Sequence, residues 1–160
     1  MKLTVSIIGS FRRHYVAVLG AIEEFETVGI EVTSPHKSII IDPTEEFVRF
    51  ESDPPWSDNA EIQLRALGRI LCADLVYVVA PGGYVGNTTC YEIGRIHERG
   101  IPLFFSEHPV DLPIPVPQAS VVNASWLAHE VARLGHVPLI DTRDIDPQIL
   151  QLQQEVLIHS

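Results

Sequence analysis

Two short segments of the chain combine residue types that favour anion binding and nucleophilic chemistry. The first runs from Gly9 to Arg13 and contains a glycine, a serine hydroxyl and two guanidinium groups. The second runs from Gly82 to Glu92 and contains three glycines, two threonines and a glutamate. Glycines let a backbone approach a ligand closely, and arginine side chains bind phosphate with paired hydrogen bonds. These segments are therefore the first candidates for a functional site.

The residue pattern leaves two interpretations of the first segment open. Free backbone N–H groups at the start of a helix, with Arg12 beside them, favour an anion. Alternatively, Ser10 only caps the helix, and the two arginines are solvated. Both interpretations place a helix directly after Gly9.

Glu92 also has two interpretations. Near the N-terminus of a helix, its carboxylate is expected to stay ionised and therefore nucleophilic. Thr89 and Glu92 also have the spacing of a capping box, in which the glutamate only satisfies a backbone N–H group. Capping and catalysis would use the same carboxylate oxygens, so the spacing alone does not decide between them.

Alternating strand and helix patterns position both segments. Apolar, β-branched runs predict strands at 3–8, 30–33, 75–80 and 101–105, and helical periodicity lies between them, with one helix opening at a capping box of Asp58 and Glu61. The alternation predicts an α/β fold: a single doubly wound (flavodoxin-like or Rossmann-like) domain over residues 1–160. We expect about five parallel strands in the order 2-1-3-4-5, with helices on both faces. Ligands of such sheets bind where the strand order reverses, which brings the two segments together.

The last third of the chain is less regular. Four prolines between residues 109 and 117 predict an extended loop, followed by an edge strand near 119–122. Ser125 is expected to cap a helix that runs through Leu134, and Asp146-Pro147 to open a last helix ending near Ile158. The stretch from Pro35 to Ser57 shows no periodicity, and we interpret it as a lid over the site.

Composition narrows the classes of partner. The 160 residues include 11 Lys+Arg and 21 Asp+Glu, a formal charge of −10, which repels nucleic acid polymers and anionic membranes. We expect a cytoplasmic protein without a membrane-spanning segment. Cys72 and Cys90 are expected to be unpaired, buried thiols. The histidines lack metal-ligand spacing, so we expect neither metal nor cofactor, although His14 and His36 follow the predicted site segments closely enough to contact a substrate.

The motifs resemble the nucleoside 2-deoxyribosyltransferase superfamily, which includes the 2'-deoxynucleoside 5'-monophosphate N-glycosidases. The resemblance spans about residues 3–106, and its most specific part is the Tyr91-Glu92-Ile93-Gly94-Arg95 segment after the glycine-rich loop. It also covers Ile8-Gly9-Ser10-Phe11-Arg12, residues 32–35, residues 73–79 and Gly100-Ile101-Pro102.

The resemblance implies that Glu92 is a nucleophile that attacks C1' of the sugar, expels the base and forms a covalent glycosyl-enzyme. Water or another base would then release the sugar, in a hydrolase or a transferase respectively. The turn at Gly9 would hold the 5' end of the sugar or a 5' phosphate. The expected substrate-binding residues are Gly9, Ser10, Phe11, Arg12, Gly83, Tyr84, Gly86, Asn87, Thr88 and Thr89.

One position departs from the family pattern. A second carboxylate, which helps the base to leave, is usual about eight residues before the Ala-Asp pair that opens the third strand. Here that position is Ala66. Asp58 and Glu61, one to two turns earlier, are candidate replacements as acid or base, or they only cap the helix. Asp74 of the Ala-Asp pair is expected to be structural.

Two functions of different classes follow. The first is cleavage or transfer at the N-glycosidic bond of a nucleoside or nucleotide. The second is a nucleotide-binding or sensing module on the same fold, which has lost catalysis with the second carboxylate. A homo-oligomer, built on a dimer, is also expected, because related enzymes complete their sites across subunits and the last helix presents a set of apolar residues. Those residues are Ile145, Ile149, Leu152, Val156 and Leu157.

Overall fold

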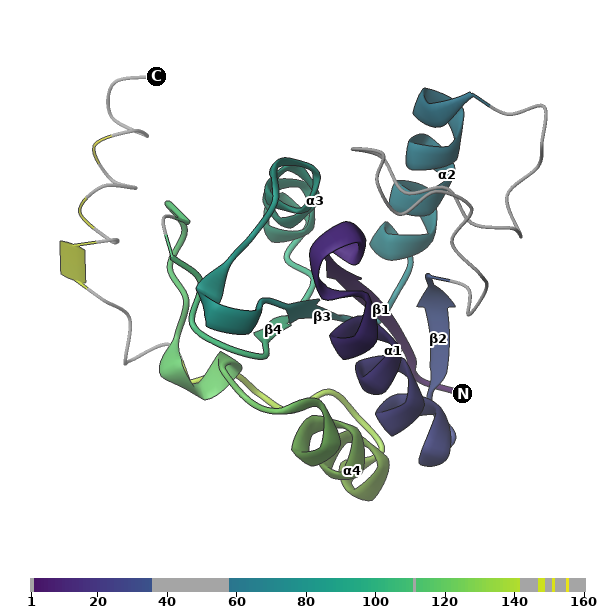
Figure 1. The fold of residues 1–160 in the computed structure, drawn as a ribbon. Helices are drawn as coiled ribbons and strands as arrows, with labels where there is room; N and C mark the ends of the chain where they lie inside the picture. Colours follow the sequence, from purple (N-terminus) through teal and green to yellow (C-terminus); the bar gives the residue numbers. More distant parts are fainter. Residues whose placement is uncertain are drawn as a thin grey trace.

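The structure is a computed structural model that describes residues 2–35, 58–110 and 112–141, together with Pro147, Gln148, Gln151 and Glu155. Strands and helices alternate along most of this length (Figure 1). The strands are β1 (Thr4–Gly9), β2 (Glu31–Ser34), β3 (Leu75–Val79) and β4 (Leu103–Phe105). The helices are α1 (Phe11–Thr27), α2 (Asn59–Leu71), α3 (Asn87–Glu98) and α4 (Ala124–Leu134).

The strands form one parallel sheet in the order β2-β1-β3-β4. This confirms the predicted α/β class and the order of the first four strands. The prediction of a fifth strand near 119–122 is wrong. Among the described residues, this segment forms only a single bridge between Phe105 and Val121. The N–H groups of Ser120 and Val121 bond back to Pro117 and Gln118 in a 3-10 turn, so only Val122 is left to donate to Phe105.

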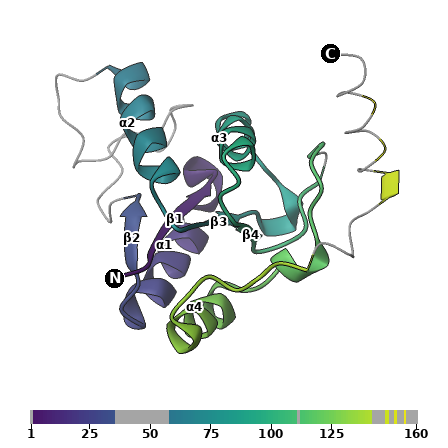
Figure 2. The same cartoon turned by 180° about the vertical axis from the view of Figure 1, so that it is seen from behind.

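Helices cover both faces of the sheet, as predicted (Figures 1 and 2). On one face, α1 and α4 pack over β1, β3 and β4, around fully buried Phe25 and Leu127. On the other face, α2 and α3 pack over β3 and β4 with Ile70, Ile93 and Ile96. A sheet buried on both faces explains why its central strand, β3, is an unbroken apolar run.

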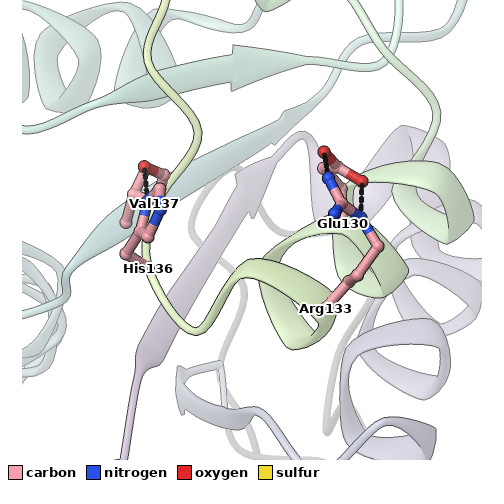
Figure 3. Close-up of polar contacts among 4 residues, drawn as sticks. All are labelled: Glu130, Arg133, His136 and Val137. Carbon is pink, nitrogen blue, oxygen red and sulfur yellow. Dashed lines mark hydrogen bonds and ion pairs between the residues drawn. The ribbon is translucent and has the colours of Figure 1, made fainter.

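An ion pair between two side chains of α4 lies near the C-terminal end of this helix (Figure 3). Arg133 donates to both carboxylate oxygens of Glu130, at 2.9 and 2.5 Å, and lowers the pKa of Glu130. Gly135 then ends the helix in a left-handed conformation (φ 72°). At the other end, the expected cap was wrong by two positions: Asn123, not Ser125, accepts from the N–H of Trp126 at 2.7 Å.

The prediction for the two cysteines is confirmed in one respect and wrong in another. Cys72 and Cys90 are free thiols, but both are exposed rather than buried, because Cys72 follows the last residue of α2 and Cys90 lies on an outward position of α3.

Pro147, Gln148, Gln151 and Glu155 are helical, as the predicted last helix requires. Its apolar positions, and the predicted lid after Pro35, lie outside the described residues. Within the described part of the chain, no helix is long and apolar enough to cross a membrane.

Candidate functional site

The two candidate segments begin at neighbouring strand ends. Gly9 at the end of β1 pairs with Val79 at the end of β3. The strands approach so closely there that a Cβ on Gly9 would lie 2.7 Å from the carbonyl oxygen of Val79. A larger residue at position 9 would push the strands apart, so this glycine is needed for the packing of the site.

The starts of α1 and α3 meet beyond these strand ends. A Cβ built on Gly86 would lie 3.9 Å from Cβ of Ser10, 4.0 Å from its Oγ and 3.9 Å from Oη of Tyr84. Both views of the fold show the beginning of α1 beside α3 (Figures 1 and 2). The topology therefore brings the two segments together, as the strand order predicts.

Neither helix start is capped by a side chain. Ser10 occupies the N-cap position of α1, but its hydroxyl makes no capping hydrogen bond. The N-cap of α3 is Gly86, which has no side chain to offer. The capping interpretations of Ser10 and of the Thr89–Glu92 pair are thus both wrong, since Thr89 is a buried residue inside the helix rather than its cap. Two uncapped N-termini at one place favour an anion.

The two arginines of the first segment behave differently. Arg12 is exposed and forms no ion pair or hydrogen bond with any residue that the structure describes. The guanidinium of Arg13 lies over the ring of Tyr84, with Cζ 4.1 Å from the ring centroid. Arg12 is consequently the arginine available to a ligand, whereas Arg13 is engaged with the glycine-rich loop.

Glu92 is half-buried in the second turn of α3, five residues and about 7.5 Å along the axis from Asn87. Burial raises the pKa of its carboxyl group to about 7. The expectation that the helix N-terminus keeps this group ionised was therefore wrong, because the helix dipole acts mainly within the first turn and no described donor contacts the carboxylate. At neutral pH, Glu92 is divided between its protonated and ionised forms.

His14 lies at an irregularity of α1. Its backbone dihedral angles (φ −127°, ψ 33°) are not helical, and its ring meets Tyr84 edge-on with 5.8 Å between centroids. Its Nδ1 is buried and has no hydrogen-bond partner in the described part of the chain. Burial, with a smaller contribution from Arg13, lowers the pKa of His14, so the ring is neutral at pH 7. His36, the other histidine named from the sequence, lies outside the described residues.

Of the other residues predicted to bind substrate, some lie at the helix starts of the site and others have structural roles. Asn87 and Thr88 open α3 beside Gly86, and Phe11 opens α1, where it packs partly against the core. Gly83 turns away from the site: at φ +77°, a Cβ there would lie 2.7 Å from the carbonyl oxygen of His108. Its backbone carbonyl accepts from the N–H of Val110 at 2.9 Å. Packing alone thus explains a glycine at position 83.

Three carboxylates outside α3 that the sequence analysis singled out, those of Asp58, Glu61 and Asp74, make structural contacts. Asp58 caps α2 by accepting from the N–H of Glu61 at 2.7 Å, and Glu61 pairs with Arg65 one turn later. Ala66, where the family pattern has its second carboxylate, is half-buried on α2. Asp74 accepts from the N–H and hydroxyl of Thr4, at 2.8 and 3.0 Å, which ties β3 to the beginning of β1, away from the site.

Sequence patterns did not indicate the contacts of Tyr84 with Arg13 and His14. These residues lie about 70 positions apart, and no periodicity links them; only the strand order places their segments together. No group of three or more metal-binding side chains comes together among the residues described.

The whole chain is compared here with protein families, curated proteins and solved structures. No protein-family model matches it, and no curated protein matches it either. Among solved structures, a conserved protein from Enterococcus faecalis V583 is similar, with a TM-score of 0.46 and 15% sequence identity. That alignment covers 97% of this chain and 99% of the other chain.

Proposed function

We propose that the protein cleaves the N-glycosidic bond of a nucleoside or nucleoside 5'-monophosphate, with Glu92 as the nucleophile. The observation that supports this most directly is one arrangement: two uncapped helix N-termini meet at Ser10 and Gly86, and α3 carries a half-buried carboxylate without a described partner. A molecule that carries both an anionic group and an electrophilic carbon, as a nucleotide does in its 5' phosphate and C1', matches these features.

The reaction needs the ionised form of Glu92. One carboxylate oxygen forms a bond to C1' as the C1'–N bond breaks, and the electron pair of that bond leaves with the base, which takes its proton from water. A second water molecule then attacks C1' and gives its proton to the hydroxide left by the first, while the bond between C1' and the carboxylate oxygen breaks, which releases the sugar and restores the carboxylate. A carboxylate that is poorly solvated, as burial of Glu92 implies, stabilises the positive charge on the sugar strongly.

The 5' phosphate would lie at the start of α1. The backbone N–H groups of the first turn and the exposed guanidinium of Arg12 provide donors there. The acidic chain as a whole does not attract a dianion, so this local set of donors is needed.

A panel of nucleosides and their 5'-monophosphates tests the proposal, with released base measured by chromatography. Glu92→Gln keeps the size of the side chain and removes the nucleophile, so base release should fall by at least about a thousandfold. Glu98→Gln, at an exposed position of the same helix, is the matched control and should retain activity. Substantial base release by the Glu92→Gln variant would refute the proposed mechanism.

A second function, nucleotide binding or sensing without catalysis, is favoured by the residues of α2. Ala66 provides no acid, and Asp58 and Glu61 are held in a cap and an ion pair. A general acid is typically worth roughly 10²–10⁴ in rate. Measurable binding of a nucleoside 5'-monophosphate by calorimetry, without base release from any member of the panel, would establish this function instead.

A further inference from the structure

The ring of Tyr84 connects the two helix starts of the candidate site. On one side, Arg13 lies over the ring at 4.1 Å, and His14 meets it edge-on with an interplanar angle of 74°. Both of these residues belong to the beginning of α1. On the other side, the hydroxyl of Tyr84 approaches Gly86, the N-cap of α3. One side chain therefore contacts the first segment while its own backbone belongs to the second.

The beginning of α1 needs support from outside the helix. At His14 the backbone departs from helical geometry, so the residues before it are not a regular continuation of the helix. The Ser10 hydroxyl does not cap this turn, although the Ser10 carbonyl accepts from the N–H groups of Arg13 and His14 at 3.1 and 2.7 Å. The contacts of Arg13 and His14 with Tyr84 support this turn from outside the helix, in addition to the partial packing of Phe11 against the core.

The loop that carries Tyr84 is itself fixed from behind. The carbonyl of Gly83 accepts from Val110 at 2.9 Å, and the N–H of Gly83 donates to Ala80 at 2.8 Å. The N–H of Gly82 donates to a carboxylate oxygen of Glu107 at 2.7 Å. The ring of Tyr84 thus extends from an anchored backbone, which makes it suited to hold α1 in place.

We propose that Tyr84 is a positioning residue: its ring holds the beginning of α1 at a fixed place relative to the N-terminus of α3. The ring, rather than the hydroxyl, carries this role, because both α1 contacts are with the ring. The identity of the ligand whose binding depends on this geometry rests on the function proposed above, but the coupling between the two helix starts does not.

The chain contains a matched control. Tyr91 and Arg95 form a second tyrosine–arginine pair, with Arg95 donating to the Tyr91 hydroxyl at 2.8 Å and lying 5.8 Å from its ring centroid. Both residues lie on α3, and Tyr91 is 51% exposed. This pair has similar chemistry but does not connect two elements.

Amide hydrogen exchange, measured by NMR without ligand, tests the coupling in the wild type and in Tyr84→Ala, Tyr84→Phe and Tyr91→Ala. In Tyr84→Ala, exchange should accelerate by about tenfold or more at His14, whose N–H donates to the carbonyl of Ser10, because the ring no longer holds this turn. Tyr84→Phe, which keeps the ring, and Tyr91→Ala should leave exchange at His14 unchanged. If exchange at His14 in Tyr84→Ala equals the wild-type rate, the ring does not hold α1 and the proposal is wrong.

Activity provides the second measurement, with a nucleoside 5'-monophosphate as substrate. Tyr84→Ala should lower kcat/KM by about ten- to a hundredfold, because misplaced binding groups weaken the transition state, and Tyr84→Phe should stay within about twofold of the wild type. Rescue by phenylalanine separates positioning by the ring from any contact made by the hydroxyl. If the wild type releases no base, the proposed function fails, whereas the exchange rates still confirm or overturn the role of Tyr84.

Discussion

At the scale of single residues, Glu92 is placed where its ionisation is unfavourable. The half-buried carboxyl has a pKa of about 7, and the same group has a pKa near 4.5 in an unfolded chain. The folded protein therefore binds this proton more tightly, and the free energy of unfolding decreases as the pH rises from about 4.5 to about 7. Residues of this kind are retained where function needs them, at a cost to stability.

Glu92→Gln should accordingly stabilise the protein at high pH. At pH 8 we expect its free energy of unfolding to exceed that of the wild type by about 1–3 kcal/mol, and at pH 4.5 the two should agree within about 0.5 kcal/mol. Urea titrations at both pH values measure this difference. Glu98→Gln, at an exposed position of α3, should show no such change between the two pH values, and a Glu92→Gln variant less stable than the wild type at pH 8 would contradict the prediction.

The two arginines of α1 should separate phosphate binding from positioning. In a Glu92→Gln background, which prevents turnover, Arg12→Ala should weaken binding of a nucleoside 5'-monophosphate by about ten- to a hundredfold and leave the nucleoside nearly unchanged. Arg13→Ala should weaken both ligands by similar factors, since Arg13 acts through Tyr84. Calorimetric titrations compare the four affinities, and an equal loss of nucleoside and nucleotide in Arg12→Ala would refute the phosphate assignment.

At the scale of elements, sequence periodicity predicted the four strands and four helices closely. Buried β-branched runs and apolar stripes depend on which residues face the core, and the core decides these elements. Predictions that depend on one hydrogen bond were less successful. Asp58 caps α2 as expected, but Ser10, Ser125 and Thr89 do not cap their helices. Whether a residue caps a helix depends on the backbone angles of that one residue. Residues of the same type one or two positions away can occupy the N-cap position instead.

The candidate site was predictable to a similar extent. The strand order alone brought Ser10 beside Gly86, because it depends on topology rather than on side chains. The raised pKa of Glu92 and the contacts of Tyr84 were not predictable, since both depend on how closely segments distant in sequence pack. The expected edge strand failed for a local reason: its N–H groups are used within a 3-10 turn.

Asp58 allows the structural and catalytic interpretations of α2 to be separated. Asp58→Ala removes the acceptor for the N–H of Glu61 and should lower the free energy of unfolding by about 1 kcal/mol. Asp58→Asn keeps an acceptor and should retain nearly all stability. Neither variant should change base release by more than about twofold. If Asp58→Asn is as stable as the wild type but loses base release by roughly 10²–10⁴, Asp58 is the missing acid after all.

At the scale of the whole molecule, the site and its surroundings have opposite electrostatic character. The chain carries a formal charge of −10, whereas the site presents helix N-termini and Arg12, which has no charged partner among the described residues. Long-range repulsion of a dianion therefore opposes short-range attraction to Arg12. Salt distinguishes the two, because the Debye length shrinks from about 30 Å at 0.01 M to about 8 Å at 0.15 M, which screens distant charges more than those in contact.

The affinity for a nucleoside 5'-monophosphate should consequently hold or rise between 0.01 M and 0.15 M salt, contrary to the usual behaviour of sites surrounded by positive charge. In Arg12→Ala, where less attraction remains to be screened, the rise should be larger. The unphosphorylated nucleoside, which is neutral, provides the control and should bind independently of salt. Calorimetric titration in the Glu92→Gln background measures these dependences. A fall of more than about tenfold for the nucleotide would show that a broad positive field, rather than the local donors at the start of α1, binds the phosphate.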